Sequence, residues 1–317
     1  MTQSALAADA ALPAEGRAAD TLQPARYVDS DGVQLAIYTW GRQPTARQAR
    51  PTLLLVHGYP DSAEVWTAVA EQLAKRFFVV AYDVRGAGRS SAPRGTEAYA
   101  LKYLVNDLAA VADAVSPHAP LHLVGHDWGA LQAWEALLSE QLAGRIASYS
   151  TAAPSLDHAG LWFQKRLGKP TPRNLLECGS QILGSAYIMV FQLPLLPELA
   201  WKLLVGRNWP RLLARIDGIQ TEARPTQTAD GQHGLGLYRA NVLQRLRRPQ
   251  PRRTEVPVQL LVMQRDPFVP ARLFECVADW TPNLRRTVID AGHWAPLSHP
   301  QAFAAAVSEF VTSVEEA

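Results

Sequence analysis

Short, unbroken apolar runs that alternate with segments of helical periodicity constrain the fold of this chain most strongly. Five of these runs are predicted strands: Leu35–Trp40, Thr52–His57, Phe77–Tyr82, Leu121–Gly125 and Ile146–Thr151. Helical spacing is found between them, over Ser62–Ala74, Tyr99–Val115 and Ala130–Glu140. Because the runs are continuously apolar, they are typical of parallel strands covered on both faces. The pattern predicts an α/β fold with a mostly parallel, doubly wound sheet.

The alternation stops after residue 154 and resumes near residue 258. Between these points the sequence is helical and interrupted by Trp and Pro, and it contains no convincing strand. Val258–Gln264 and Arg286–Ile289 are again strand-like, and Pro300–Glu315 is a predicted closing helix. We therefore expect a core domain of residues 27–154 and 250–317, a helical insertion over residues 155–249, and a disordered tail over residues 1–26.

Composition argues against several classes of protein. A net charge of +2 gives no strong field for nucleic acid. Two cysteines, Cys178 and Cys276, cannot build a disulfide framework, and the histidines lack the spacing of metal ligands. We therefore expect no metal site. The basic segment Arg245–Arg253 contains two prolines and is interpreted as a solvated linker rather than a binding patch.

Two further segments lack the features of targeting or membrane elements. Residues 1–26 lack the basic region and the unbroken apolar region of a secretory signal. The most membrane-like stretch, Leu183–Val205, contains two prolines and two charges, so we expect a pair of amphipathic helices rather than a membrane span. A cytoplasmic location is the resulting expectation.

The segment Gly125-His126-Asp127-Trp128-Gly129 lies between a predicted strand and a predicted helix. This is the setting of a nucleophile elbow, G-x-S-x-G, with Asp127 at the serine position. Asp127 would lie at a helix N-terminus, where the helix dipole favours an ionised carboxylate. A carboxylate nucleophile suits displacement at saturated carbon and gives an alkyl ester. The alternative is an Asp that only caps the helix.

Three further groups are expected at matching strand ends. His57-Gly58-Tyr59-Pro60 ends a predicted strand, so the backbone N–H groups of Tyr59 and Trp128 are candidates for an oxyanion hole. Asp266 follows the strand VQLLVMQ, and His293 follows the strand RTVI. The chain order of nucleophile, acid and histidine is that of α/β hydrolases.

With these motifs the sequence resembles the epoxide hydrolase branch of the α/β hydrolase superfamily, over about residues 27–315. HGYP, GHDWG, YDVRGAGRS and GHW match its motifs, and the proline of the first is commonly cis in that branch. The resemblance implies an α/β-hydrolase fold with an inserted helical lid, which contributes two tyrosines in the family. Tyr187 (in YIMVFQ) and Tyr238 (in GLYRAN) match them, although Leu193-Pro194 departs from the usual Glu-Pro.

The resemblance also implies a function, the opening of an apolar epoxide to a vicinal diol with no cofactor. Asp127 would form the covalent ester, and Tyr187 and Tyr238 would donate hydrogen bonds to the epoxide oxygen. His293, supported by Asp266, would activate water for hydrolysis of the ester. Substrate contacts are expected from Trp128, Phe191 and Trp294. The expected partners are a small epoxide and water, and the oligomeric state is left open, with a homodimer as one option.

Two other functions stay open at this point. A haloalkane dehalogenase shares the fold and the Asp nucleophile, but it needs side-chain N–H donors for the halide. Trp128 would supply one donor, whereas Tyr59 stands where a second is common, and the tyrosine pair suits an ether oxygen better. A non-catalytic receptor on a hydrolase scaffold would need none of this geometry. A dinucleotide site at Gly86-Ala87-Gly88 is disfavoured because the third glycine of that fingerprint is missing.

Overall fold

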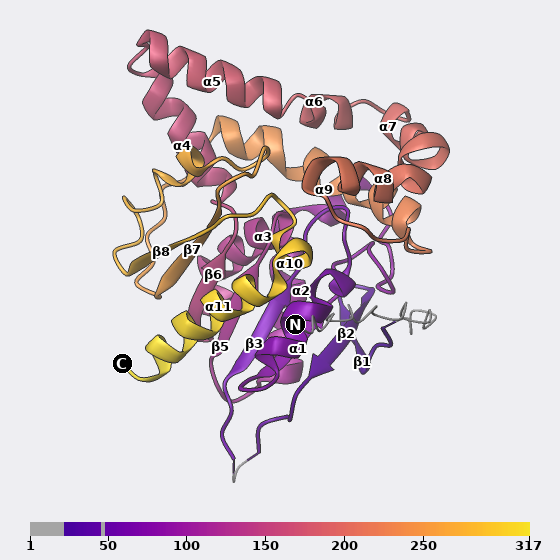
Figure 1. Ribbon diagram of the computed structural model, residues 1–317, viewed down its shortest axis with the longest axis vertical. Helices are drawn as coiled ribbons and strands as arrows, with labels where there is room; N and C mark the ends of the chain where they lie inside the picture. The colour runs from indigo at the N-terminus through magenta and orange to yellow at the C-terminus, as the bar shows by residue number, and fades with distance from the viewer. Residues whose placement is uncertain (1–21, 46–47) are drawn as a thin grey trace, which may run out of the picture.

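The computed structural model describes residues 22–45 and 48–317, which form an eight-stranded sheet with helices on both faces (Figure 1). The strands are β1 (Arg26–Ser30), β2 (Val33–Trp40), β3 (Thr52–Val56), β4 (Phe78–Tyr82), β5 (Leu121–Gly125), β6 (Ile146–Thr151), β7 (Val258–Met263) and β8 (Leu284–Ile289). Their order in the sheet is β1-β2-β4-β3-β5-β6-β7-β8. Only β2 pairs antiparallel with its neighbours β1 and β4, and all other pairs are parallel. The predicted α/β fold with a mostly parallel sheet is confirmed.

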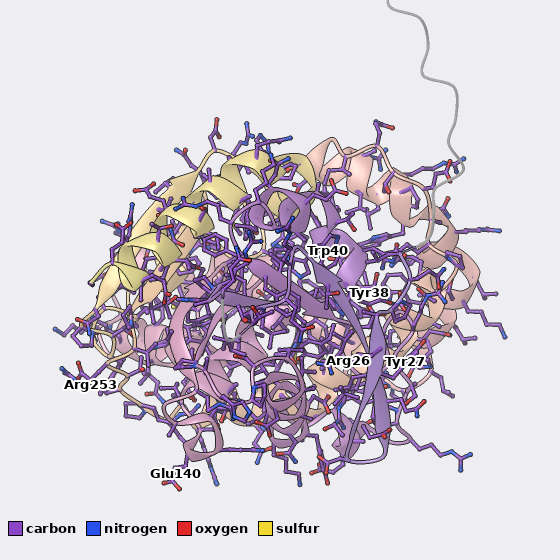
Figure 2. All side chains as sticks on the ribbon, turned by 90° about the horizontal axis from the view of Figure 1, so that it is seen from below. Arg26, Tyr27, Tyr38, Trp40, Glu140 and Arg253 are labelled. Carbon is purple, nitrogen blue, oxygen red and sulfur yellow. The ribbon has the colours of Figure 1, made fainter. Side chains whose placement is uncertain are left out.

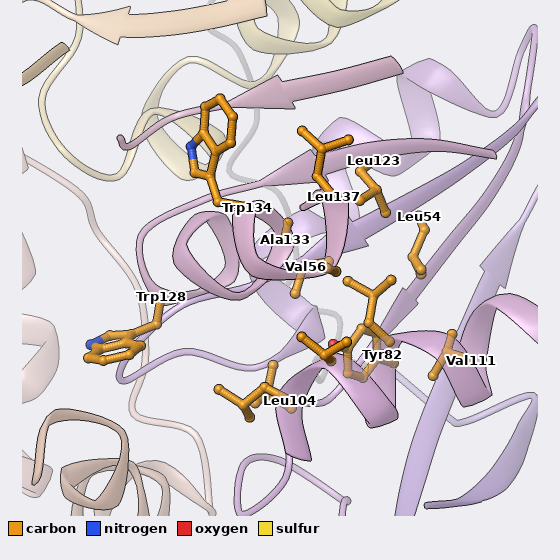
Figure 3. Close-up of a cluster of buried hydrophobic side chains, with 14 of the residues drawn as sticks. Leu54, Val56, Tyr82, Leu104, Val111, Leu123, Trp128, Ala133, Trp134 and Leu137 are labelled. Atoms are coloured by element: carbon orange, nitrogen blue, oxygen red, sulfur yellow. The ribbon is translucent and has the colours of Figure 1, made fainter. Parts of the chain in front are cut away.

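The two faces of the sheet explain the continuous apolar runs. On one face, Leu53 and Leu55 of β3 belong to a buried cluster with α1 (Thr67–Leu73) and α11 (Pro300–Glu315). On the other face, the alternate residues Leu54 and Val56 pack with α2 (Leu101–Val115) and α3 (Trp128–Leu137). Figure 3 shows Leu54 and Val56 beside Ala133 and Leu137 of α3. Since both faces are buried, such a strand shows a nearly continuous apolar run instead of an alternation of apolar and polar residues.

The first strand was not predicted from the sequence. The β1 sequence, RYVDS, is mostly exposed at the edge of the sheet, where Arg26 and Tyr27 are labelled in Figure 2. The predicted tail over residues 1–26 therefore ends too late: Arg26 begins β1, and the Ala25 amide donates a hydrogen bond to the carbonyl oxygen of Ile37. Residues 1–21 of that tail lie outside the described residues.

Between β6 and β7 the chain forms helices only, all within the described residues. We call this segment the helical insertion. It consists of α4 (Leu156–Leu167), α5 (Pro172–Gly184), α6 (Tyr187–Phe191), α7 (Leu196–Ala200), the π-helical turn η4 (Trp201–Val205), α8 (Gly206–Asp217) and α9 (Gln227–Arg247). In Figure 1 the insertion lies across one end of the sheet, with α5, α6 and α7 along the outer edge of the molecule. The stretch Leu183–Val205 is divided among several of these short helices. In the part of the chain that the structure describes, no helix has the length and apolar character needed to cross a bilayer.

An ion-pair network ties the insertion to the core. Arg245 of α9 contacts Glu135 of α3 at 2.8 Å and Asp157 of α4 at 2.7 Å. Arg252 contacts the same two carboxylates at 2.6 and 2.8 Å. The interpretation of the basic segment as a solvated linker is therefore wrong for Arg245 and Arg252. It holds for Arg253, which is exposed in Figure 2. Two arginines between two carboxylates fix the first and last long helices of the insertion against α3.

Candidate active site

Asp127 lies in a strained turn between β5 and α3. Its φ of 51° is in the left-handed region, which costs a residue other than glycine about 1–3 kcal/mol. Its side chain makes no capping hydrogen bond to α3, which counts against the helix-cap alternative. The turn is also crowded: a Cβ atom on Gly129 would overlap the carbonyl oxygen of Val56, and one on Gly58 would overlap the Asp127 carboxylate. These contacts force a sharp turn that projects the carboxylate away from the sheet.

The carboxylate of Asp127 is held from two sides. Its Oδ1 accepts a hydrogen bond of 2.7 Å from the backbone N–H of Tyr59, and its Oδ2 lies 3.6 Å from Nε2 of His293. Burial alone would raise the pKa of Asp127, but the hydrogen bond and the charge of His293 outweigh burial and hold that pKa below its usual range. Trp128 is the first residue of α3, where N–H groups have no acceptor within the helix. Asp127 is therefore an ionised carboxylate beside two predicted oxyanion-hole groups.

Asp266 and His293 form a buried pair behind this carboxylate. Nδ1 of His293 lies 2.7 Å from Oδ2 of Asp266, and Oδ1 of Asp266 accepts hydrogen bonds from the amides of Phe268 and Val269 at 2.7 and 2.9 Å. Burial alone would lower the pKa of His293, but the charges of Asp266 and Asp127 raise it well above its ordinary value. His293 is thus held in one orientation and favours its protonated form while both carboxylates are charged.

Several residues outside the predicted site hold His293 and Trp294 in place. Nε2 of His126 lies 2.7 Å from the carbonyl oxygen of His293. The indole N–H of Trp294 donates to Asp61 at 3.0 Å, and its backbone N–H donates to Asp217 at 2.6 Å. Asp61 and Asp217 are absent from the sequence prediction because their partner lies 233 and 77 residues away.

Tyr187 of α6 and Tyr238 of α9 lie close together on the insertion, with ring centroids 6.1 Å apart. The rings of Trp128, Phe191 and Tyr59 pack around Tyr238 at 4.9, 5.0 and 5.2 Å. Burial raises the pKa of both tyrosine hydroxyls, and the charge of Asp127 raises it further. Both side chains are therefore hydrogen-bond donors at neutral pH.

Two apolar cavities meet at these groups. One, of about 250 Å³, extends beneath α4 to α6, and the other, of about 330 Å³, extends beneath α6 to α8. Both are lined by Asp127, Tyr187, Tyr238 and Phe268. The predicted contact residue Trp128 lines the first cavity, and Phe191 and Trp294 line the second. Phe268 was missed by the sequence prediction, although an aromatic residue two positions after Asp266 was a signal that could have found it.

The structure therefore brings all of the residues predicted for the site to one place. Asp127, Asp266 and His293 come from the core, and the two tyrosines come from the insertion. Within the described residues no group of three or more His, Cys, Asp or Glu side chains is arranged to hold a metal ion. Cys178 and Cys276 are buried free thiols that pack near Trp162, away from the carboxylate.

Sheet topology, elbow and inserted helices define the class of the protein. The chain belongs to the alpha/beta hydrolase fold family, whose model matches residues 51–300.

The protein named probable oxidoreductase EphD of Mycobacterium tuberculosis is 37% identical over 299 residues, which cover 92% of this chain and 50% of that protein. The chain thus spans about half the length of this relative. Epoxide hydrolase 3 of Mus musculus is 28% identical over 271 residues, covering 79% of this chain and 68% of that protein.

Among solved structures, the epoxide hydrolase of Bacillus megaterium in complex with an inhibitor superposes with a TM-score of 0.71. The identity is 21%, and the match covers 90% of this chain and 100% of that chain. At this identity the likeness supports the fold.

Proposed function

We propose that this protein is an epoxide hydrolase that opens an apolar epoxide to a vicinal diol through an ester on Asp127. One observation carries the proposal: an ionised carboxylate and two protonated tyrosines line the same apolar cavities, with a His–Asp pair behind the carboxylate. Acyl transfer needs no pair of side-chain donors opposite the nucleophile, whereas ring opening of an ether does. The names of relatives such as epoxide hydrolase 3 support the same conclusion.

The first step is attack on the ring. One Asp127 oxygen forms a bond to a ring carbon, the carbon–oxygen bond of the epoxide breaks, and its electron pair stays on the oxygen. Negative charge grows on that oxygen as the bond breaks, so hydrogen bonds from Tyr187 and Tyr238 stabilise the transition state more than the bound substrate. A proton delivered through the tyrosine pair completes the hydroxyl group.

The second step is hydrolysis of the ester. Ester formation removes the negative charge of Asp127, which is one of the two charges that raise the pKa of His293. The pKa of His293 then falls, and the imidazole releases a proton that balances the one delivered to the epoxide oxygen. Neutral His293, oriented by Asp266, takes a proton from water as the water oxygen attacks the ester carbonyl. The bond between the carbonyl carbon and the diol oxygen then breaks, the diol oxygen takes the proton of His293, and the carboxyl group formed on Asp127 returns a proton to His293. The backbone N–H groups of Tyr59 and Trp128 would stabilise the tetrahedral oxyanion.

The helical insertion is the lid in this proposal, with domain boundaries as expected from the sequence. It supplies both tyrosines and much of the apolar lining of the two cavities, which suits an uncharged substrate with apolar substituents. Location in the cytoplasm and the option of a homodimer stay predictions from the sequence.

A haloalkane dehalogenase is the weaker alternative because a departing halide needs side-chain N–H donors. The indole N–H of Trp294 donates to Asp61 instead of pointing into the cavity. Burial of Tyr187 and Tyr238 beside Asp127 has no use in halide release. A non-catalytic receptor would bind an epoxide and leave it unchanged.

Single-turnover reaction with excess enzyme in ¹⁸O-water tests the proposal, with styrene oxide as the probe. The label should enter Asp127, and the first-turnover diol should be unlabelled, because the second oxygen of that diol comes from the carboxylate. His293→Gln should accumulate the ester, detected as a mass increase on the Asp127 peptide. Tyr187→Phe with Tyr238→Phe should prevent that mass increase. Label in the first-turnover diol would rule out the covalent scheme, and halide release from 1-chlorobutane without epoxide turnover would favour the dehalogenase.

A further inference from the structure

The outer surface of the insertion carries an unusual concentration of exposed apolar side chains. In the described part of the chain, 13 of the 16 large apolar residues that are exposed lie between residues 175 and 212, on α5 to α8 and on the turn between α6 and α7. Of these helices, α5, α6 and α7 lie along the outer edge of the molecule in Figure 1. The most exposed residues are Leu183 (77%), Leu176 (74%), Leu195 (72%), Leu203 (62%), Ile182 (60%) and Leu204 (59%). We call the exposed side chains of α5 to α8 the outer face. So large an apolar surface marks an interaction site.

Positive charge accompanies the apolar residues. Residues 155–249 contain 13 Lys and Arg against 6 Asp and Glu, a net charge of +7 in a chain whose total is only +2. Lys202 of η4 and Arg207, Arg211 and Arg215 of α8 are exposed and alternate along the chain with Leu203, Leu204 and Leu212. Among the described residues none of these four cations is in an ion pair. The cations are therefore available to an anionic partner.

Acidic side chains near the outer face are already engaged. Glu177 is paired with Arg166 and Arg173, Glu198 is paired with Arg239, and Asp217 accepts the backbone N–H of Trp294. A second copy of the chain would bring the same unpaired cations against themselves, and among the described residues of the insertion Glu222 is the one exposed carboxylate outside an ion pair. Charge complementarity thus disfavours a symmetric protein contact through this face.

The two cavities reach toward the same face. Ile182 and Met189, which are 60% and 57% exposed, line the first cavity. Val190 and Leu212, which are 45% and 38% exposed, line the second. Side chains of the outer face therefore extend from the surface to the chamber that contains Asp127.

We propose that the outer face docks on an anionic lipid bilayer, with the leucines of α5 to η4 in the interfacial region and the cations of η4 and α8 against the headgroups. Short helices with exposed leucines and interspersed Lys and Arg match the chemistry of an interfacial membrane surface. If the proposed function holds, the cavities of the docked enzyme open toward the phase in which an apolar epoxide dissolves. The docking itself does not depend on that function.

Flotation of the full chain with vesicles tests the docking. Vesicles of phosphatidylcholine and phosphatidylglycerol at a ratio of 7:3 should carry the protein upward, and binding should weaken from 50 mM to 500 mM NaCl because salt screens surface charge. Vesicles of phosphatidylcholine alone should bind at least tenfold more weakly. Equal binding to both compositions, or no binding to either, would overturn the proposal.

Two variants of the outer face and two controls locate the contact. Leu203→Gln with Leu204→Gln should reduce the partition coefficient about tenfold or more, because both side chains lose their apolar burial in lipid. Lys202→Gln with Arg207→Gln and Arg211→Gln should reduce it about 100-fold, at about fivefold per cation. The apolar control is Val288→Gln on β8, and the charge control is a triple exchange to Gln at exposed core positions, Arg42, Arg76 and Arg94. Neither control should reduce binding by more than about threefold per site.

Readouts without vesicles keep the outcomes distinct. Circular dichroism and turnover of water-soluble styrene oxide should be unchanged in the outer-face variants, because Lys202, Leu203, Leu204, Arg207 and Arg211 line neither cavity. If the wild type did not turn over styrene oxide, the proposed function would be refuted, and the flotation result would still stand. A dimer in analytical ultracentrifugation that Leu203→Gln with Leu204→Gln dissociates, without vesicle binding, would assign the face to a second copy and overturn the proposal. Vesicle binding that is lost when residues 1–21 are deleted would assign the binding to that segment and also overturn the proposal.

Discussion

Exchange of Asp266 for Asn separates the two chemical steps of the proposed mechanism. In the protein, Oδ2 of Asp266 accepts from Nδ1 of His293 at 2.7 Å, while Oδ1 accepts from the amides of Phe268 and Val269. The amide oxygen of Asn can keep the two backbone contacts. Its NH₂ group then faces Nδ1 and requires Nδ1 to accept, so Nε2 carries the proton. The imidazole in that tautomer cannot take a proton from water.

The expected magnitude follows from the loss of the base and of its supporting charge. Loss of the correct tautomer in a comparable His–Asp pair lowers the rate about 10⁴-fold, equivalent to about 5.5 kcal/mol in the activation free energy. Only ester hydrolysis uses His293 as a base, so ester formation should slow far less. In Asp266→Asn we expect an initial burst in which one equivalent of epoxide per enzyme is consumed without release of diol. Turnover after this burst should be about 10⁴-fold slower than in the wild type. Rapid-quench mass spectrometry of the Asp127 peptide measures both phases.

A second buried carboxylate provides the control. Asp61 accepts from the indole of Trp294 at 3.0 Å and makes no hydrogen bond to His293. Asp61→Asn should keep this acceptor, reduce turnover by less than about tenfold and accumulate no ester. If Asp266→Asn slowed ester formation as much as hydrolysis, or if Asp61→Asn trapped the same ester, the assignment of Asp266 as the residue that orients His293 would be wrong.

Two further predictions concern stability. Burial lowers the pKa of His158 from 6.5 to about 4, so the unfolded chain takes up a proton first and stability is lost as the pH falls from 6.5 toward 4. His158→Gln, which keeps the capping box with Ser155, should remove about 2.4 kcal/mol of loss between pH 7 and pH 4.5, measured by urea unfolding at these two pH values. Parallel pH profiles of the two proteins would contradict this prediction. Gly129→Ala should lower the free energy of unfolding by about 3 kcal/mol or more, because the added Cβ overlaps the carbonyl oxygen of Val56. Gly179→Ala, at a helical position with open space, should be neutral or stabilising; equal effects of the two exchanges would refute the steric reasoning.

The sequence was sufficient for the core because burial on both sheet faces leaves an unmistakable pattern. All seven predicted strands overlap observed ones, and their ends differ by two residues at most. β1 escaped prediction because an exposed edge strand needs no apolar run. Over Leu183–Val205 the sequence predicted a pair of helices but not their division into α6, α7 and the π-helical turn η4, since five-residue helices have too few positions to show a period. Local sequence thus predicts elements that bury a full face and misses those stabilised by their neighbours.

The residues of the candidate site also fall into two groups, those that the local sequence predicts and those that depend on contacts between distant segments. Asp127, Asp266 and His293 were predictable because each follows a strand whose carboxyl end lies at the same edge of the sheet. Asp61 and Asp217 were not predictable from the sequence. Each carboxylate acquires its role only when the fold brings it to Trp294, where Asp61 accepts from the indole N–H and Asp217 accepts from the backbone N–H. The strain at Asp127 shows why both kinds of residue are needed. A nucleophile held at a φ of 51° persists only where surrounding contacts over-determine its position. The turn depends on Gly58 and Gly129, which can be recognised in the sequence. The contacts that hold His293 and Trp294 near the turn come from segments far apart in the chain.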